Sequence, residues 1–201
     1  MPVSASSSSQ PQILLLPDGG PQVPLQPLQP DGGPQPRVEP GLARWQGLHG
    51  AVLLEQHDWQ RPLRGDWSAR LQETLVDAPA PVVLVASGLG CILAAWWAAH
   101  SPAAAKVRGA LLLAPVDVEQ PALREQLPGW SPIARQRLPF ASILAARAQH
   151  AACSLERAQA LAQAWGSTFV ALDDAADDTT RDDWDAGRTL LQTLLKDEKP
   201  W

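Results

Sequence analysis

Residues 82–100, VVLVASGLGCILAAWWAAH, constrain the fold of this chain more than any other stretch. The run from Val82 to Val85 is apolar and mostly β-branched, which is typical of a strand buried on both faces. Residues 91–100 are rich in alanine and include a leucine, and both residue types favour a helix. Between these two runs lies a short segment of mostly small residues, 86–90. The stretch therefore predicts a buried strand that leads through a sharp turn directly into a helix.

A strand, a sharp turn and a helix in this order form the nucleophile elbow of α/β-hydrolases, whose motif is G-x-S-x-G. The elbow needs small residues two positions before and two positions after its apex, because the strand and the helix approach closely there. With Gly88 at the apex, the flanking residues are Ala86 and Gly90. With Ser87 at the apex, a valine and a leucine flank it, and both are too large. The sequence thus predicts an elbow whose apex is glycine.

Apolar runs and helix-forming segments alternate along the rest of the chain. The expected strands are residues 13–16, 51–55, 82–85, 109–114, 140–147 and 168–172. The expected helices are residues 42–48, 67–76, 91–100, 155–165 and 184–196. Asp66 and Ser154 are the expected N-caps of the second and fourth helices, and Gly166 is expected to end the fourth. A single helical turn is expected within 116–139, and an acidic loop at 173–183. This alternation predicts an α/β fold with a mostly parallel sheet of about six strands and helices on both faces. Functional groups in such sheets lie at the C-terminal ends of the strands.

The N-terminal part of the chain has a different composition. Residues 1–12 are rich in serine and glutamine and are expected to be a disordered tail, and residues 13–201 are expected to form one domain. The sequence PDGGPQ at 17–22 recurs at 30–35, within a proline- and glycine-rich insertion at 17–40 that excludes a helix or a central strand. We expect a flexible, polyproline-like loop; a proline-rich ligand for a partner domain is the alternative.

Composition excludes several classes of function. The 201 residues are 45% apolar and carry a net charge of −5 without a basic patch, so neither nucleic acid nor an anionic membrane is an expected partner. The two cysteines, Cys91 and Cys153, form neither a disulfide framework nor a metal pattern, and both are expected to be buried thiols. We therefore expect no cofactor and a cytoplasmic location. The Trp96-Trp97 pair is expected to place at least one ring in the core. The sequence indicates no oligomeric state.

Three longer blocks carry a resemblance to a known family. They are EQHDWQRPLRGDWSARL at 55–71, the elbow block at 82–115, and PGWSPIARQRLPFASILAARAQHAACSLERAQALAQAWGS at 128–167; with DDW at 182–184 they cover nearly everything after residue 42. These blocks resemble the small α/β-hydrolases related to retinoblastoma-binding protein nine and bacterial YdeN. The resemblance implies a single-domain α/β-hydrolase fold and a carboxylesterase-like serine hydrolase activity, with a Ser-Asp-His triad.

All three triad positions differ from the pattern that the resemblance implies. The nucleophile position, within A-H-S-L-G-C in relatives, holds Gly88. The acid position, within N-D-P-Y-C-S, holds His150, and the base position, within a Gly-His pair after the last strand, holds Asp177. We therefore expect a catalytically inactive pseudo-hydrolase with a binding role, for a small ester-like ligand or a protein partner.

Further candidate residues belong to an oxyanion hole and to an alternative, rearranged active site. The resemblance places the candidate oxyanion-hole positions at Leu89, directly after the apex, and at Asp18, in the loop after the first strand. The alternative to an inactive protein is an active esterase that uses Ser87 with His150 and Asp177. That arrangement requires His150 within about 3 Å of the serine hydroxyl.

Overall fold

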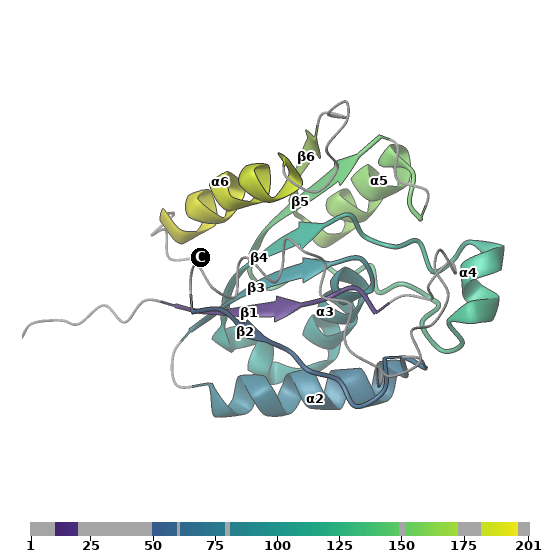
Figure 1. Cartoon of the computed structure of the whole chain (residues 1–201), viewed down its shortest axis with the longest axis horizontal. Helices are drawn as coiled ribbons and strands as arrows, with labels where there is room; N and C mark the ends of the chain where they lie inside the picture. Colours follow the sequence, from purple (N-terminus) through teal and green to yellow (C-terminus); the bar gives the residue numbers. More distant parts are fainter. Residues whose placement is uncertain are drawn as a thin grey trace, which may run out of the picture.

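The computed structural model describes residues 11–19, 50–59, 61–78, 81–148, 152–172 and 182–196 (Figure 1). Within them, six parallel strands form one open sheet in the order β2-β1-β3-β4-β5-β6. The strands are β1 (Gln12–Leu16), β2 (Val52–Leu53), β3 (Val82–Ser87), β4 (Val107–Leu113), β5 (Ala141–Arg147) and β6 (Thr168–Leu172). The helices are α2 (Arg64–Asp77), α3 (Leu89–His100), the 3₁₀ helix η1 (Pro102–Lys106), α4 (Pro121–Gln126), α5 (Leu155–Trp165) and α6 (Asp182–Lys196). No helix among these residues is both long and apolar enough to cross a membrane.

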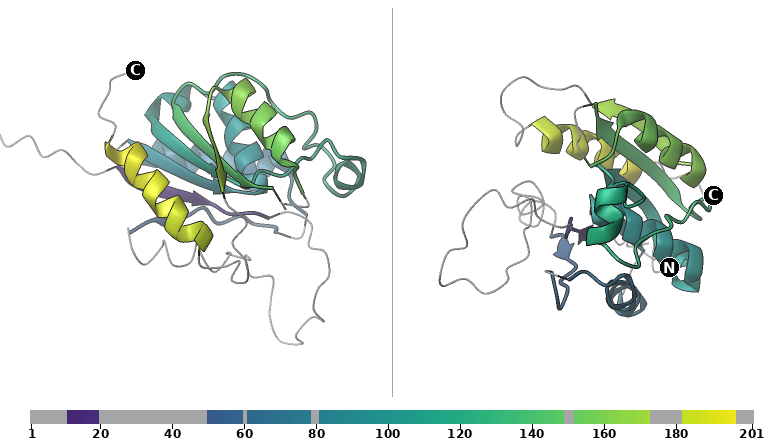
Figure 2. Two further views of the ribbon diagram at one scale, coloured as in Figure 1. Left: turned by 90° about the horizontal axis from the view of Figure 1, so that it is seen from above. Right: turned by 90° about the vertical axis from the view of Figure 1, so that its right-hand side faces the viewer.

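Helices cover both faces of the sheet (Figures 1 and 2). Helices α2, α3 and α5 lie on one face, and α6 lies on the other. Successive side chains of a strand point to opposite faces, and β3 follows this rule: Leu84 packs in the core under α3, whereas Val83 and Val85 pack in the core under α6. Both faces of β3 are therefore buried, which confirms the α/β fold and explains the unbroken apolar run of this strand.

The strand order reverses direction between β1 and β3. The chain continues from β1 to β2 on one side, and the later strands follow on the other side of β1. Parallel sheets of this kind bind their ligands outside the C-terminal ends of the strands at such a reversal. The pairing of Leu16 with Ala86 sets the two strand ends level. The loops that follow β1 and β3 are therefore neighbours, although about 70 residues separate them in sequence.

The expected elbow is present between β3 and α3. Gly88 has φ 52° and ψ −118°, a backbone conformation that favours glycine, and α3 begins at the next residue. A Cβ atom on Gly90 would lie 2.4 Å from the carbonyl oxygen of Leu16. The first turn of α3 therefore lies directly against the backbone of β1, which is the physical reason for a small residue two positions after the apex.

Other boundaries differ from the sequence-based expectations. Helix α2 begins at Arg64, so Asp66 lies in its first turn rather than at the N-cap; a carboxylate there still interacts favourably with the helix dipole. Strand β2 is shorter than expected: it spans Val52–Leu53, and the N–H of Leu54 also donates to the carbonyl of Leu15 on β1 at 2.9 Å. Helix α6 begins at Asp182, two residues earlier than expected. Ser154 is confirmed as an N-cap, because its hydroxyl accepts the N–H of Arg157. The tail, the expected helix at 42–48 and most of the proline-rich insertion lie outside the described residues.

Replacing Gly90 with alanine is expected to destabilise the protein by about 1–3 kcal/mol, because the new methyl group must displace the Leu16 carbonyl or bend α3. Gly65, in the first turn of α2, is the matched control, since a Cβ there meets no atom within 4 Å. Gly65→Ala is expected to be neutral or to stabilise by up to about 1 kcal/mol. Urea unfolding measures the free energy of unfolding of both variants, and the dependence of that free energy on urea concentration should be the same as in the wild type. Equal free energies of unfolding for the two variants would contradict the close approach of α3 to β1.

Candidate functional site

The C-terminal ends of β1 and β3 bring Asp18, Gly88 and Leu89 together. The N–H of Leu89 donates to Oδ1 of Asp18 at 2.9 Å. A Cβ atom built on Gly88 would lie 2.1 Å from Cγ of Asp18, and 2.4 and 2.5 Å from its two oxygens. The carboxylate of Asp18 therefore fills the space into which a side chain at the elbow apex would project.

Helix α3 supplies part of the attraction between these residues. Leu89 is its first residue, so its N–H belongs to the group of helix amides that have no partner within the helix. A carboxylate at this end is stabilised by the hydrogen bond and by the positive end of the helix dipole. The two positions that the sequence proposed for the oxyanion hole are thus in direct contact, and the donor of one is bonded to the side chain of the other.

Tryptophan rings hold the loop that carries Asp18. A Cβ atom on Gly19 would lie 2.0 Å from Cη2 of Trp67 and 3.1 Å from Cε3 of Trp59, so only glycine fits there. Trp59 and Trp67 pack edge to face with ring centroids 5.2 Å apart, and Trp130 packs on Trp67 at 5.5 Å. The indole N–H of Trp130 donates to the carbonyl of Pro62 at 2.7 Å. This aromatic cluster fixes the end of β1 against α2.

Ser87 is the last residue of β3 and is only 3% exposed. By the alternation of the strand it lies on the same face as Val83 and Val85, towards α6. Its hydroxyl has no hydrogen-bond partner within the described part of the chain. His150 and Asp177 lie outside the described residues, so the roles assigned to these three residues stay predictions.

Ion pairs and hydrogen bonds fix the segment that follows the acid position. The N–H of Asp117 donates to the carbonyl of Ala152 at 2.9 Å, and Nε2 of Gln120 donates to the same oxygen at 3.2 Å. Arg157, on α5, pairs with Asp117 at 3.2 Å and also with Glu119. The loop after β4 thereby connects this segment to α5. These partners have no signature in the sequence, because they depend on how the loop after β4 folds.

The carboxylate of Glu119 contacts three partners in this cluster. It accepts the N–H of Ile133 at 3.0 Å, pairs with Arg135 at 2.7 Å and pairs with Arg157. Burial on its own would raise the pKa of the Glu119 carboxyl, but the hydrogen bonds from Ile133 and Arg157 and the charges of the two arginines outweigh it. The pKa of Glu119 is therefore lowered, and the charged form is favoured in the folded state.

Both cysteines are buried thiols. The thiol of Cys91 donates to the carbonyls of Ala86 and Leu113, each at 3.4 Å. Burial, reinforced by the negative charge of Asp117, raises the pKa of Cys153 to about 11. A thiol with that pKa is protonated at neutral pH and is a poor nucleophile. Among the described residues, His, Cys, Asp and Glu side chains form no cluster of three suited to a metal ion.

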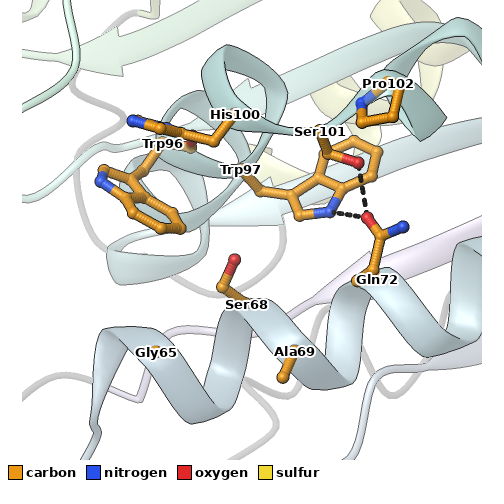
Figure 3. A pocket seen from close by; sticks show the side chains of 9 residues that line it. All are labelled: Gly65, Ser68, Ala69, Gln72, Trp96, Trp97, His100, Ser101 and Pro102. Carbon is orange, nitrogen blue, oxygen red and sulfur yellow. Dashed lines mark hydrogen bonds between the residues drawn. The ribbon is translucent and has the colours of Figure 1, made fainter.

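A groove between α2 and α3 lies at a different place in the fold (Figure 3). Its volume is about 410 Å³. Residues 65–72 of α2 and residues 96–102 of the other wall line it. Oε1 of Gln72 accepts hydrogen bonds from the Trp97 indole at 2.8 Å and from the Ser101 hydroxyl at 2.5 Å, which ties the two walls together. Trp97 is buried and Trp96 is half-buried, so one ring of the pair is in the core as expected. The groove includes none of the sequence-proposed site residues.

Comparison with known proteins identifies the family. Residues 43–193 match the family model described as serine hydrolase. The chain belongs to the serine hydrolase family. This agrees with the resemblance carried by the elbow and by the two blocks on either side of it. No curated protein sequence matches the chain.

Several solved structures share the fold of this chain. A protein described as a YdeN-like hydrolase, from Pectobacterium atrosepticum, has a TM-score of 0.72 at 19% identity, over 96% of this chain and 95% of that one. The ydeN gene product of B. subtilis has a TM-score of 0.63 at 14% identity, over 92% and 98%. Esterase 2 of Thermogutta terrifontis has a TM-score of 0.62 at 14% identity, over 92% and 82%. These likenesses confirm the α/β-hydrolase fold.

Glu119→Gln is expected to lower the free energy of unfolding at pH 7 by about 1–3 kcal/mol, because a charged acceptor of buried hydrogen bonds is lost. A carboxyl whose pKa is lowered by folding stabilises the protein above its unfolded pKa, and this stabilisation is lost as the pH falls through the folded pKa. The variant should therefore lose less stability than the wild type below about pH 4.3. Urea unfolding at several pH values measures this.

The control is Glu73→Gln, which removes an exposed pair with Arg70 at 3.5 Å. It is expected to change stability by less than about 1 kcal/mol. If Glu119→Gln behaved like Glu73→Gln across the acidic range, the pairing of Glu119 with Arg157 would not contribute to stability.

Proposed function

We propose that this member of the serine hydrolase family has no Ser-Asp-His turnover and uses its site for binding. One observation carries the proposal: the Asp18 carboxylate occupies the space of an apex side chain and accepts the Leu89 N–H. The residue types at the three triad positions, Gly88, His150 and Asp177, support it.

Two requirements of acyl transfer are affected by this arrangement. The first is the nucleophile, since Gly88 has no side chain to attack an acyl carbon. The second is the oxyanion hole, to which the N–H of the residue after the nucleophile belongs in α/β-hydrolases. Here that N–H, on Leu89, is already donated to a carboxylate. An oxyanion at the same place would also be repelled by the negative charge of Asp18. Loss of a single oxyanion donor lowers kcat by about 10²–10³ in a well-studied protease.

The proposed ligand is small and ester-like, and a protein partner is the alternative. The fold places the site at the strand-order reversal, where small molecules bind in open α/β sheets. The Thermogutta terrifontis esterase with the same fold has been described with propionate bound, which is the acid product of an ester. A rise in the melting temperature with added methyl propionate tests this ligand class.

An active esterase is the second candidate function. The buried hydroxyl of Ser87 favours it, because it has no hydrogen-bond partner within the described residues and buried hydroxyls are almost always paired. In this alternative Ser87 is the nucleophile, His150 its base and Asp177 the acid.

Hydrolysis of p-nitrophenyl acetate distinguishes the two functions. The wild type and Ser87→Ala are both expected to hydrolyse it at the rate of the buffer alone. Gly88→Ser is expected to stay inactive. The double variant Gly88→Ser/Asp18→Gly, in which the space around the new side chain is cleared, is also expected to be inactive, because the residues at the acid and base positions differ from the family pattern as well. Turnover by the wild type that disappears in Ser87→Ala would establish the rearranged site instead.

Stability measurements on the same variants test the crowding of the site. Gly88→Ser should destabilise the wild type more than it destabilises Asp18→Gly, since its side chain and the Asp18 carboxylate cannot share one space. A coupling free energy of about 0.5–3 kcal/mol is expected from the double-mutant cycle of urea unfolding. Additive effects would contradict the position of Asp18 described above.

A further inference from the structure

The groove between α2 and α3 contains a hydroxyl that the fold itself does not use. Ser68 lies within α2 and is only 9% exposed. It lines the groove, and Figure 3 shows its hydroxyl directed from α2 towards α3. Within the described part of the chain this hydroxyl has no hydrogen-bond partner. Most buried hydroxyls are paired, and alanine is the better helix former, so the groove has a polar position that its own walls leave unsatisfied.

A guanidinium group lies at one end of the groove. Arg64 is the first residue of α2 and precedes Gly65, which lines the groove. Its guanidinium carbon lies 4.8 Å from the centroid of the Trp96 ring, and its Nη1 donates to the carbonyl of Trp130 at 3.3 Å. No carboxylate among the described residues pairs with it. Arg64 is half-buried, and this burial lowers the pKa of the guanidinium. A cation that is partly removed from water, without a counter-charge, attracts an anion more strongly than an exposed cation does.

The α3 wall of the groove has a fixed aromatic surface. The rings of Trp96 and His100 stack with centroids 4.3 Å apart and planes 22° apart. Nδ1 of His100 lies 2.7 Å from the carbonyl oxygen of Trp96. A carbonyl only accepts hydrogen bonds, so Nδ1 carries the proton and donates it. The ring of Trp96 is thus held by His100 and by Arg64, and a ligand packing against this wall needs to order little of it.

The chemistry of these groups selects the kind of ligand. The groove volume of about 410 Å³ accommodates a small organic molecule. Tryptophan, alanine and proline side chains make much of its lining apolar, and none of the described residues that line it is acidic. A cation at one end and an unsatisfied hydroxyl in the wall suit an acceptor with negative charge. A molecule with an apolar body and one carboxylate matches all of these features.

We propose that the groove between α2 and α3 binds small carboxylic acids with an aromatic body. The carboxylate of the ligand accepts hydrogen bonds from the guanidinium of Arg64 and the hydroxyl of Ser68. These two residues are four apart, so they lie one turn apart on the same face of α2. The aromatic body packs against Trp96. This site is separate from the ends of β1 and β3, and the proposal goes beyond the proposed function and does not depend on it.

The test uses the full chain and phenylacetate in isothermal titration calorimetry. Phenylacetate is expected to bind at one site per chain. Phenylacetamide has nearly the same shape without the charge, and it is expected to bind at least about tenfold more weakly. The indole N–H of Trp97 donates to Gln72 between the two walls of the groove, so its NMR resonance is expected to shift as phenylacetate is added.

Two variants test the proposed contacts separately. Ser68→Ala is expected to lower the affinity for phenylacetate by about 3- to 10-fold. It should not lower the stability of the protein, because the hydroxyl has no partner in the described chain. Arg64→Gln is expected to lower the affinity by at least about tenfold. Arg70→Gln is the matched control, since Arg70 is an exposed cation of the same helix that pairs with Glu73 outside the groove, and it should leave the affinity unchanged.

The proposal is overturned if phenylacetate does not bind saturably, or if phenylacetamide binds equally well. It is also overturned if Ser68→Ala and Arg64→Gln bind phenylacetate as the control does. If Arg64→Gln fails to fold, Ser68→Ala still decides the outcome. Neither variant should change the response of the melting temperature to methyl propionate, which concerns the ends of β1 and β3. Failure of this proposal and failure of the proposed function are therefore distinguishable.

Discussion

The close approach of α3 to the end of β1 is the constraint on which the rest of the site depends. The first turn of the helix lies on the backbone of β1, and Gly90 leaves room for the Leu16 carbonyl. This approach brings the loop after β1 within hydrogen-bond distance of the helix N-terminus. The tryptophan cluster then holds that loop from the other side, through the glycine that follows Asp18. A small rotation of α3 would break the hydrogen bond from the N–H of Leu89 to the carboxylate of Asp18.

Two kinds of interaction stabilise the two halves of this sheet edge. Near β1 and β3 the tryptophan rings pack edge to face, and the carboxylate of Asp18 accepts the N–H of Leu89 at the helix N-terminus. Beyond β4 the loops are fixed by carboxylates and guanidinium groups that surround Arg157. Ion pairs of this kind weaken as their carboxylates are protonated and as salt screens them, whereas the contact of indole rings with glycine contains no titratable group. The loops beyond β4 are thus the part of this edge that is held by ion pairs.

The sequence was sufficient to predict the sheet, the elbow and its glycine apex, because these follow from local patterns. An apolar run, a turn of small residues and a helix can be recognised within the 19 residues of one stretch. The position of the Asp18 carboxylate could not be predicted in this way, since it depends on the pairing of β1 with β3 across about 70 residues. The start of α2 was missed for a different reason: Asp66 is an equally good residue type for the N-cap and for the first turn.

The shared space at the apex also has a consequence for the order in which this site can change. Residues 18 and 88 cannot both carry a side chain directed at the same point. A lineage that acquires a hydroxyl at residue 88 must therefore shorten residue 18 first, or pass through a destabilised intermediate. Protein families cross such intermediates rarely, because marginal stability removes them. The carboxylate of Asp18 therefore couples the two positions: a hydroxyl at residue 88 needs a change at residue 18 as well, and not a single substitution.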